Sequence, residues 1–271
     1  MITLKNKVVV ITGASSGFGA SAAKMFAKEG CKVVLAARRL NRLEELAGEI
    51  RKAGGEALPV ATDVSQPAQV EAMVKSALDA YGRIDILFNN AGFGRLDWLE
   101  ALDPVKDIQA QITVDLLGVI WVARAVVPHM LRQKSGHIIN MCSMAGWAAP
   151  PLYTAYSAAK FGMRGFSEAL RREVMPFGVK VSLIYPGGAK TEFQQHIGQN
   201  EAKKRFRTPE WMRLTADDVA CSVIGLAKRP RRNLIVPGLM VFSKFANSHF
   251  AGLSDIVQAK AFAPFHKVWF E

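Results

Sequence analysis

Short apolar runs alternate with longer segments of helical hydrophobic spacing along the first two-thirds of the chain. The runs have the length and composition of buried strands. The segments between them carry apolar residues at every third or fourth position, which is typical of helices that pack one face on a core. The predicted strands are residues 8–12, 32–37, 57–61, 84–88, 136–141, 179–185 and a short 235–236. The predicted helices are residues 18–29, two that begin at the N-caps Asn41 and Ser65, and residues 104–132 and 154–175.

This order of elements predicts one α/β domain over residues 1–271, because strand–helix–strand units form parallel sheets with right-handed crossovers. We expect a doubly wound parallel sheet of the Rossmann type, in which ligands bind at the carboxyl ends of the strands. The loops that follow the strands should therefore carry the chemistry. Within this domain, residues 192–216 are predicted to be a mobile substrate loop, and residues 233–271 an aromatic-rich C-terminal extension.

The composition agrees with a folded domain, because 50% of the residues are hydrophobic and 21% are charged. No run reaches the roughly 18 consecutive apolar residues of a membrane span, and the first strand begins too early for a signal peptide. We therefore expect a cytoplasmic protein. Cys31, Cys142 and Cys221 and the five histidines lack the spacing of metal ligands, so no metal site is predicted and the thiols are expected in the core.

The net charge is +12 and is spread along the chain. Residues 1–190 hold 23 basic and 16 acidic residues (+7), and residues 191–271 hold 12 and 7 (+5). No basic arm or aromatic RNA-binding motif is present, so nucleic acid is not expected as a partner. Solvated surface charge explains this balance, and attraction of an anionic substrate, cofactor or lipid headgroup is the alternative.

Gly13, Gly17 and Gly19 follow the first predicted strand, in the segment TGASSGFG. Glycines there permit a tight turn, close approach of the backbone to a diphosphate, and close packing of the next helix on the strand. The N-terminus of that helix presents free N–H groups and the positive end of its dipole to the phosphates. The segment therefore predicts a dinucleotide site.

Tyr156 and Lys160 stand at positions i and i+4 of a predicted helix, thirteen residues beyond Ser143. A free phenol has a pKa of about 10, too high for proton transfer at neutral pH. A cation about 4 Å away contributes about 4 kcal/mol at an effective dielectric constant of about 20, enough to bring that pKa into the working range. Ser143 can orient a substrate oxygen toward Tyr156, while Tyr153 lacks an i+4 lysine and is expected to line the pocket.

These motifs, in this order, resemble the short-chain dehydrogenase/reductase family over residues 5–192. The matching segments are TGASSGFG, Asp63-Val64, NNAG at residues 89–92, Ser143, Tyr156 with Lys160, and PGGAKT at residues 186–191. The resemblance implies carbonyl–alcohol interconversion, with Tyr156 as acid or base and Lys160 also holding the nicotinamide ribose. The predicted cofactor-binding residues are Gly13, Ser15, Ser16, Gly17, Phe18, Gly19, Arg38, Asp63, Val64, Asn90, Ala91, Gly92, Tyr156, Lys160, Pro186, Gly187, Ala189 and Thr191.

The end of the second strand favours NADP(H) over NAD(H). Sites for NAD usually place an acid there, and by the resemblance Ala37 holds that place. A guanidinium can grip a 2′-phosphate with two hydrogen bonds, so Arg38 is the expected phosphate ligand, with Ser15 as a helper and Arg39 solvated. The alternative is that both arginines are surface charge.

Two acidic residues, Asp63 and Asp115, each have more than one possible role. By the resemblance, Asp63 holds the adenine amino group; a turn or capping role is the structural alternative. Asp115, in the segment DLLG, stands where the family usually has an asparagine whose backbone carbonyl positions a water linked to the lysine. We count Asp115 with the catalytic set; it should raise the pKa of Lys160 if close, and Asp115→Asn is predicted to keep activity within a few-fold.

The C-terminal extension lacks the glycine-rich ending of many bacterial members, such as the 3-oxoacyl-carrier-protein reductases. Its aromatic residues favour core and dimer packing, with a lid over a lipophilic substrate and a membrane-surface contact as alternatives. With Trp98, Trp147 and Leu152 expected near the cleft, the extension suggests a bulky apolar carbonyl or alcohol substrate. We expect a homo-oligomeric enzyme; the alternative function is a redox sensor that binds NADP without turnover.

Overall fold

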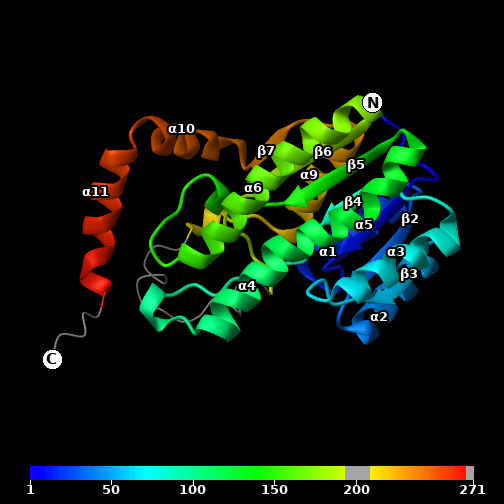
Figure 1. The fold of residues 1–271 in the computed structure, drawn as a ribbon, viewed down its shortest axis with the longest axis horizontal. Helices are drawn as coiled ribbons and strands as arrows, with labels where there is room; N and C mark the ends of the chain where they lie inside the picture. Colours follow the sequence, from blue (N-terminus) through cyan, green and yellow to red (C-terminus); the bar gives the residue numbers. More distant parts are fainter. Residues whose placement is uncertain (193–207, 267–271) are drawn as a thin grey trace.

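A computed structural model describes residues 1–192 and 208–266 of the chain (Figure 1). Its centre is a parallel sheet of seven strands in the order β3-β2-β1-β4-β5-β6-β7, so the doubly wound fold is confirmed. All seven predicted strands are present, with bounds that shift by at most two residues. The strands are β1 Val8–Thr12, β2 Lys32–Ala37, β3 Glu56–Ala61, β4 Ile86–Asn89, β5 Gly136–Met141, β6 Val179–Pro186 and β7 Asn233–Val236.

Helices cover both faces of the sheet. On one face, α1, α2 and α9 enclose a core with the inward side chains of β1 and β2. On the other face, α3, α5 and α6 enclose a second core. The main helices are α1 Gly17–Lys28, α2 Leu40–Lys52, α3 Pro67–Tyr81, α4 Ala110–Ile112, α5 Gly118–Gln133, α6 Thr154–Val174, α9 Ala216–Lys228, α10 Val241–His249 and α11 Ala251–Phe262.

Two predicted N-caps are wrong by one or two residues. The helix α2 begins at Leu40 with Arg39 as its N-cap, because only two residues separate it from β2, and Asn41 lies in its first turn. The helix α3 begins at Pro67, a residue favoured at the first helical position. Ser65 precedes that helix, and its N–H donates to the Asp63 carboxylate in a turn.

The predicted helix over residues 104–132 is a continuous helical run with two π-helical segments, Pro104–Gln109 and Thr113–Leu117. Among the described residues, Pro104–Gln133 alone has the length and apolar character that a membrane-crossing helix needs. Its α5 part contributes buried side chains to the core between α3, α6 and the sheet. The run is thus a core helix, and π-helical segments such as Thr113–Leu117 often occur at functional sites.

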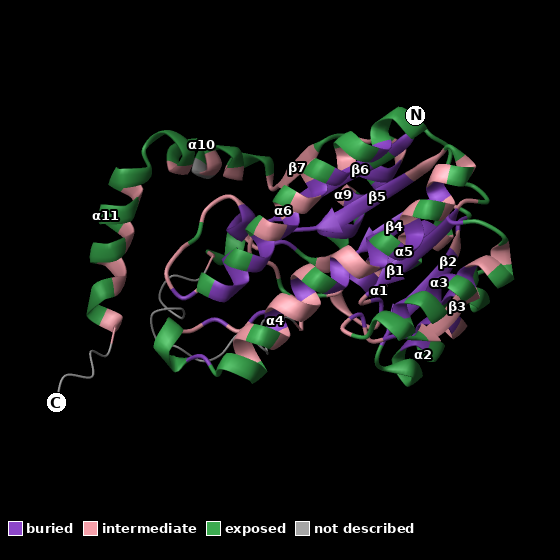
Figure 2. Ribbon diagram, viewed as in Figure 1, coloured by how far each residue is buried: buried purple, intermediate pink, exposed green. Residues whose placement is uncertain are grey.

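The C-terminal extension leaves the body of the domain after β7. Its helices α10 and α11, which we call the arm, extend away from the sheet (Figure 1), and none of their described side chains is buried (Figure 2). Core packing is therefore the wrong interpretation for Phe242, Phe245 and Phe250, which are exposed. Trp269 and Phe270 lie outside the described residues, as does most of the predicted substrate loop, residues 193–207.

The cysteine prediction is confirmed for two positions of three. Cys31 and Cys142 are buried, whereas Cys221 is exposed on α9. In the described parts of the chain, no three His, Cys, Asp or Glu side chains are grouped as a metal site would require.

A buried carboxylate joins the beginnings of β1 and β4 at the end of the sheet opposite the carboxyl ends of its strands. Asp85 accepts a hydrogen bond from Val8 N–H at 3.0 Å and is ion-paired with Lys7 and Arg83. Burial raises its pKa, but the hydrogen bonds from Arg83, Val8 and Lys7 outweigh burial and hold the pKa below its usual value.

Replacing Asp85 by asparagine should lower the free energy of unfolding by about 2 kcal/mol at neutral pH, because hydrogen bonds to a charged group are lost. Since the folded pKa is depressed, this contribution is complete above about pH 4 and is lost as the pH falls through the folded pKa. Urea unfolding at several pH values measures the difference between variant and wild type, which should shrink in acid. A difference that stays constant down to acid pH would contradict the assignment.

Candidate active site

The glycine-rich turn between β1 and α1 is held against the loop after β4. Gly13 has a φ of +66°, and a Cβ there would lie 2.8 Å from Ala91 Cα. The Asn90 side-chain amide donates to the carbonyls of Thr12 at 3.0 Å and Gly13 at 3.2 Å. Gly19 faces the carbonyl of Gly13 so closely that no side chain fits. The turn therefore needs glycine, and it brings the N-terminus of α1 beside a cavity.

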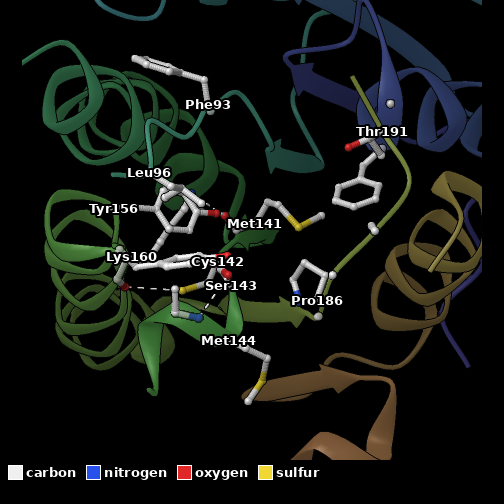
Figure 3. Close-up of a pocket in the computed structure, with 18 of the residues that line it drawn as sticks. Phe93, Leu96, Met141, Cys142, Ser143, Met144, Tyr156, Lys160, Pro186 and Thr191 are labelled. Atoms are coloured by element: carbon white, nitrogen blue, oxygen red, sulfur yellow. Dashed lines mark hydrogen bonds between the residues drawn. The ribbon is translucent and has the colours of Figure 1, made fainter. Parts of the chain in front are cut away.

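That cavity has a volume of about 850 Å³ and runs from the glycine-rich turn to Tyr156. Figure 3 shows Ser143, Tyr156 and Lys160 on one side of it, and Pro186 and Thr191 on the other. Every predicted cofactor-binding residue except Gly19 lines it. The sheet topology thus brings together segments from the ends of β1 to β6, as expected for a doubly wound fold.

Both arginines after β2 line the cavity, and Arg39 also makes side-chain contacts that the sequence did not predict. Arg38 is exposed and lines the cavity. Arg39 is exposed, as predicted, but it also donates to the hydroxyls of Ser15 at 3.0 Å and Ser16 at 2.9 Å and pairs with Glu192 at 3.1 Å. Hydrogen bonds from Ser16 and Arg39 lower the pKa of Glu192. Both guanidinium groups therefore lie at the expected 2′-phosphate end of the cavity.

Asp63 has the turn role that the sequence left open. One of its carboxylate oxygens accepts a hydrogen bond from Ser65 N–H at 2.9 Å, and its own N–H donates to the side chain of Gln69. Because Asp63 and Val64 also line the cavity, this turn role and a contact with an adenine group are compatible.

Ser143, Tyr156 and Lys160 meet where β5 ends and α6 begins. Ser143 is the N-cap of the short 3-10 turn after β5, and a hydrogen bond joins its side chain to the Tyr156 hydroxyl. Lys160 lies one helical turn beyond Tyr156, with its Nζ 5.4 Å from the centroid of the phenol ring. Both side chains are buried, at 7% and 3% exposed. Tyr153 lines the same cavity, as predicted.

The electrostatics of the phenol differ from the prediction. Burial raises the pKa of Tyr156 to about 12. Lys160 lowers this pKa, which is the predicted sign, but the charge of Asp115 raises it and offsets part of that effect. In the protein alone, the lysine therefore does not bring the phenol into the neutral range, because the low-dielectric site disfavours phenolate.

Asp115 lies behind Lys160 and forms a buried ion pair with it. Asp115 Oδ2 is 3.3 Å from Lys160 Nζ, and both side chains are at most 4% exposed. Lys160 also donates to the carbonyl of Met141 at 3.3 Å, and Asp115 Oδ1 accepts from Phe93 N–H at 2.9 Å. Burial alone would lower the pKa of Lys160, but Asp115 raises it above its usual value, as expected. Asp115 does not line the cavity, so we correct its assignment from catalytic to positioning residue.

Known proteins resemble the chain over most of its length. A family model described as short chain dehydrogenase matches residues 7–202. An uncharacterized oxidoreductase of Staphylococcus saprophyticus is 38% identical over 207 residues, which are 75% of this chain and 82% of that protein.

Two solved structures match as well. A short-chain dehydrogenase/reductase from Burkholderia phymatum in complex with NAD has a TM-score of 0.84 and 30% identity, covering 94% of this chain and 97% of its own. An alcohol dehydrogenase from Thermococcus sibiricus complexed with 5-hydroxy-NADP has a TM-score of 0.76 and 29% identity, covering 86% and 96%.

The chain is a short-chain dehydrogenase/reductase. It is therefore an oxidoreductase, and the resemblance seen in its motifs is confirmed.

Sequence reasoning named no individual residue on one wall of the cavity in this short-chain dehydrogenase/reductase, although a lid formed by the C-terminal extension was among its alternatives. Besides Leu152, which was predicted, the cavity is lined by further residues of the loops after β4, β5 and β6 and by residues of the arm. The additional lining residues include Leu96, Met144, Glu192, Asn247, Ser254, Gln258 and Phe262. No local signal could have identified the arm residues, because about a hundred residues separate them from Tyr156 and only the path of the arm brings them near.

Two of the predicted cleft residues lie elsewhere. Trp147 packs between the cations of Arg164, 3.4 Å from the ring centroid, and Lys244, at 3.8 Å. Trp98 makes an edge contact with His266. Neither tryptophan lines the cavity. Their rings instead contact residues at the beginning of the arm and just beyond its end, and these contacts join the arm to the body.

Replacing Asp115 by asparagine should shift the pH dependence of turnover rather than abolish it. The amide oxygen can still accept the hydrogen bond from Phe93 N–H, but the charge that raises the pKa of Tyr156 is removed. Alcohol oxidation needs the deprotonated phenol, so its rate should begin to rise at lower pH than in the wild type. We expect kcat near neutral pH to stay within a few-fold.

The pH–rate profiles of Asp115→Asn and of Asp79→Asn, an exposed carboxylate on α3, measure this shift. An unmoved profile would show that the Asp115 charge does not act on Tyr156. A loss of about a hundredfold, the size of a general acid–base contribution, would instead assign Asp115 a direct role.

Proposed function

We propose that this enzyme interconverts a carbonyl and an alcohol by hydride transfer with NADP(H). One observation carries the proposal: the Tyr156 hydroxyl is hydrogen-bonded to Ser143 and backed by Lys160, in a cavity that continues to the glycine-rich turn. The turn fits a dinucleotide, because a Cβ at Gly13 or Gly19 would fill the space that its backbone needs. When bound, the nicotinamide would supply or accept the hydride.

Each catalytic side chain then has one task. Ser143 donates a hydrogen bond to the substrate oxygen and orients it toward Tyr156. Tyr156 gives its hydroxyl proton to that oxygen during reduction and takes it back during oxidation. Lys160 keeps its positive charge beside the phenol, which favours the phenolate and opposes the effect of burial. Asp115 raises the pKa of Lys160 and holds its ammonium in place through the ion pair.

The proposed preference for NADP(H) rests on the residues after β2. Position 37 is an alanine, so no carboxylate occupies the place that holds the ribose in NAD sites. Arg38 lines the cavity next to it, and Arg39 is bonded to Ser15 and Ser16 in the glycine-rich turn. The structural relatives include complexes with NAD and with 5-hydroxy-NADP. The proposed preference for NADP(H) over NAD(H) therefore rests on the arginines of this chain.

The proposed substrate is a bulky, apolar ketone, aldehyde or alcohol. The apolar lining of the cavity includes Leu96, which packs with Tyr156, and also Met144 and Leu152. Leu152 is buried and has a φ of +74°, a strained backbone for a bulky residue. Such strain often occurs at functional sites. This wall favours apolar groups next to the reacting carbon.

Replacing Tyr156 by phenylalanine should lower kcat by about a hundredfold or more, because the proton donor is removed while the ring remains. Binding of NADPH should be retained. The matched control is Tyr153→Phe, since Tyr153 lines the same cavity with its ring centroid 6.2 Å from that of Tyr156. NADPH oxidation against ketones and aldehydes of increasing size measures both variants. Cofactor binding without turnover on the whole panel would favour the redox-sensor function instead.

Replacing Arg38 by alanine should raise KM for NADPH by about tenfold or more and leave KM for NADH nearly unchanged. Loss of charge-assisted hydrogen bonds to a 2′-phosphate costs about 1.5–3 kcal/mol, and 1.4 kcal/mol is about tenfold. The control is Arg42→Ala, on α2. Arg39→Ala, tested alongside, separates a direct contact from support of Ser15 and Ser16. Equal KM values of the wild type for the two cofactors would refute the NADP preference.

A further inference from the structure

The helix α10 turns its polar side chains toward the body and its aromatic side chains toward solvent. Lys244 Nζ lies 3.8 Å from the centroid of the Trp147 ring, and Asn247 Nδ2 donates to the Trp147 carbonyl at 3.1 Å. Phe242 and Phe245, on the other side, are 72% and 54% exposed. This arrangement is the reverse of a surface helix that packs an apolar face on a core.

The helix α11 likewise turns polar side chains toward the body and apolar side chains toward solvent. Ser254 and Gln258 are partly covered and line the cavity, and Gln258 Nε2 donates to Ser254 Oγ at 2.9 Å. Leu253, Ile256 and Val257 are exposed at i, i+3 and i+4, so they form one outward stripe. The inward face thus presents polar side chains to the cavity, and large aliphatic side chains point away from the protein.

The outward side chains concentrate in one short segment. Of the eighteen large hydrophobic side chains that are exposed in the described chain, eight lie between residues 239 and 257. They are Leu239, Val241, Phe242, Phe245, Phe250, Leu253, Ile256 and Val257. Single exposed hydrophobic residues are ordinary, but such a concentration on two successive helices points to an interaction surface.

The arm is held at both ends, so it presents this surface in an ordered state. Trp147 fixes α10 through Lys244 and Asn247. Beyond α11, His266 contacts the Trp98 ring with centroids 4.2 Å apart, and its Nε2 lies 3.0 Å from Glu100 Oε1. An interface that is ordered before binding loses less conformational entropy when its partner arrives.

We propose that the arm is a membrane-surface anchor that lies in the headgroup region of an anionic bilayer. The chain has a net charge of +12, and the arm itself carries Lys244 and Lys260 against Asp255. Anionic lipid attracts a basic protein and accepts exposed Phe, Leu and Ile side chains at the acyl boundary. A second copy of this chain would bring a like net charge of +12, so electrostatics favours an anionic lipid surface over a second copy as the partner. The arm also extends away from the body (Figure 1), where a flat bilayer can reach it.

Flotation of the full chain with vesicles tests this surface without relying on turnover. The vesicles are phosphatidylcholine alone and phosphatidylcholine mixed with phosphatidylglycerol. The test variant is Phe242→Ser/Phe245→Ser. The matched control is Met175→Ser/Phe177→Ser, whose wild-type side chains are 65% and 54% exposed between α6 and the start of β6, at the opposite end of the strands from the arm. Circular dichroism and NADPH binding confirm that each variant is folded.

The wild type and the control should float with the mixed vesicles, and less with phosphatidylcholine alone. The bound fraction of Phe242→Ser/Phe245→Ser should fall by about tenfold or more, because two inserted aromatic side chains are lost. Three results would overturn the proposal: no binding of the wild type to either vesicle, equal loss in both variants, or an oligomer of the wild type that dissociates only when the two phenylalanines are replaced. The last would identify a second copy of the chain as the partner.

Discussion

A buried ammonium needs partners to stay charged, and Lys160 obtains them from separate segments of the fold. Asp115, in a π-helical segment, supplies the counter-charge, and the end of β5 supplies the Met141 carbonyl. Asp115 also binds Phe93 N–H, which places the loop after β4. A buried ammonium without these partners would be unfavourable in the low dielectric of the protein interior. The ion pair and the hydrogen bonds therefore hold these segments in one mutual arrangement.

The same ion pair sets the chemistry of the site. Asp115 holds the lysine in place, yet its charge opposes the effect of the lysine on Tyr156 and keeps the phenol pKa high. The same carboxylate therefore has two opposing effects: it positions Lys160, and its charge disfavours the phenolate form of Tyr156. The geometry around it is tight, since a Cβ on Gly92 would lie 3.0 Å from Asp115 Oδ1. A glycine at that position lets the loop after β4 pass close to the carboxylate.

Hydrophobic periodicity was reliable in the body of the domain and misleading in the arm. In the body, each predicted apolar stripe meets the sheet, and the strands and most helices were predicted to within a few residues. The aromatic residues after β7 suggested core packing by the same rule, but Phe242, Phe245 and Phe250 face outward. A pattern shows that a side chain is apolar and which residues share a face. It does not show what that face meets.

The sequence by itself determined the sheet, the glycine-rich turn, and the Tyr156–Lys160 pair. Each depends on local geometry: strand and helix periods, the backbone freedom of glycine, and the one-turn spacing of i and i+4. Only the tertiary structure decided that Arg39 reaches Ser15 and that the arm forms a wall of the cavity. It also decided that Asp115 lies 3.3 Å from Lys160. Those contacts join residues far apart in the chain, so packing between elements determines them and local spacing does not.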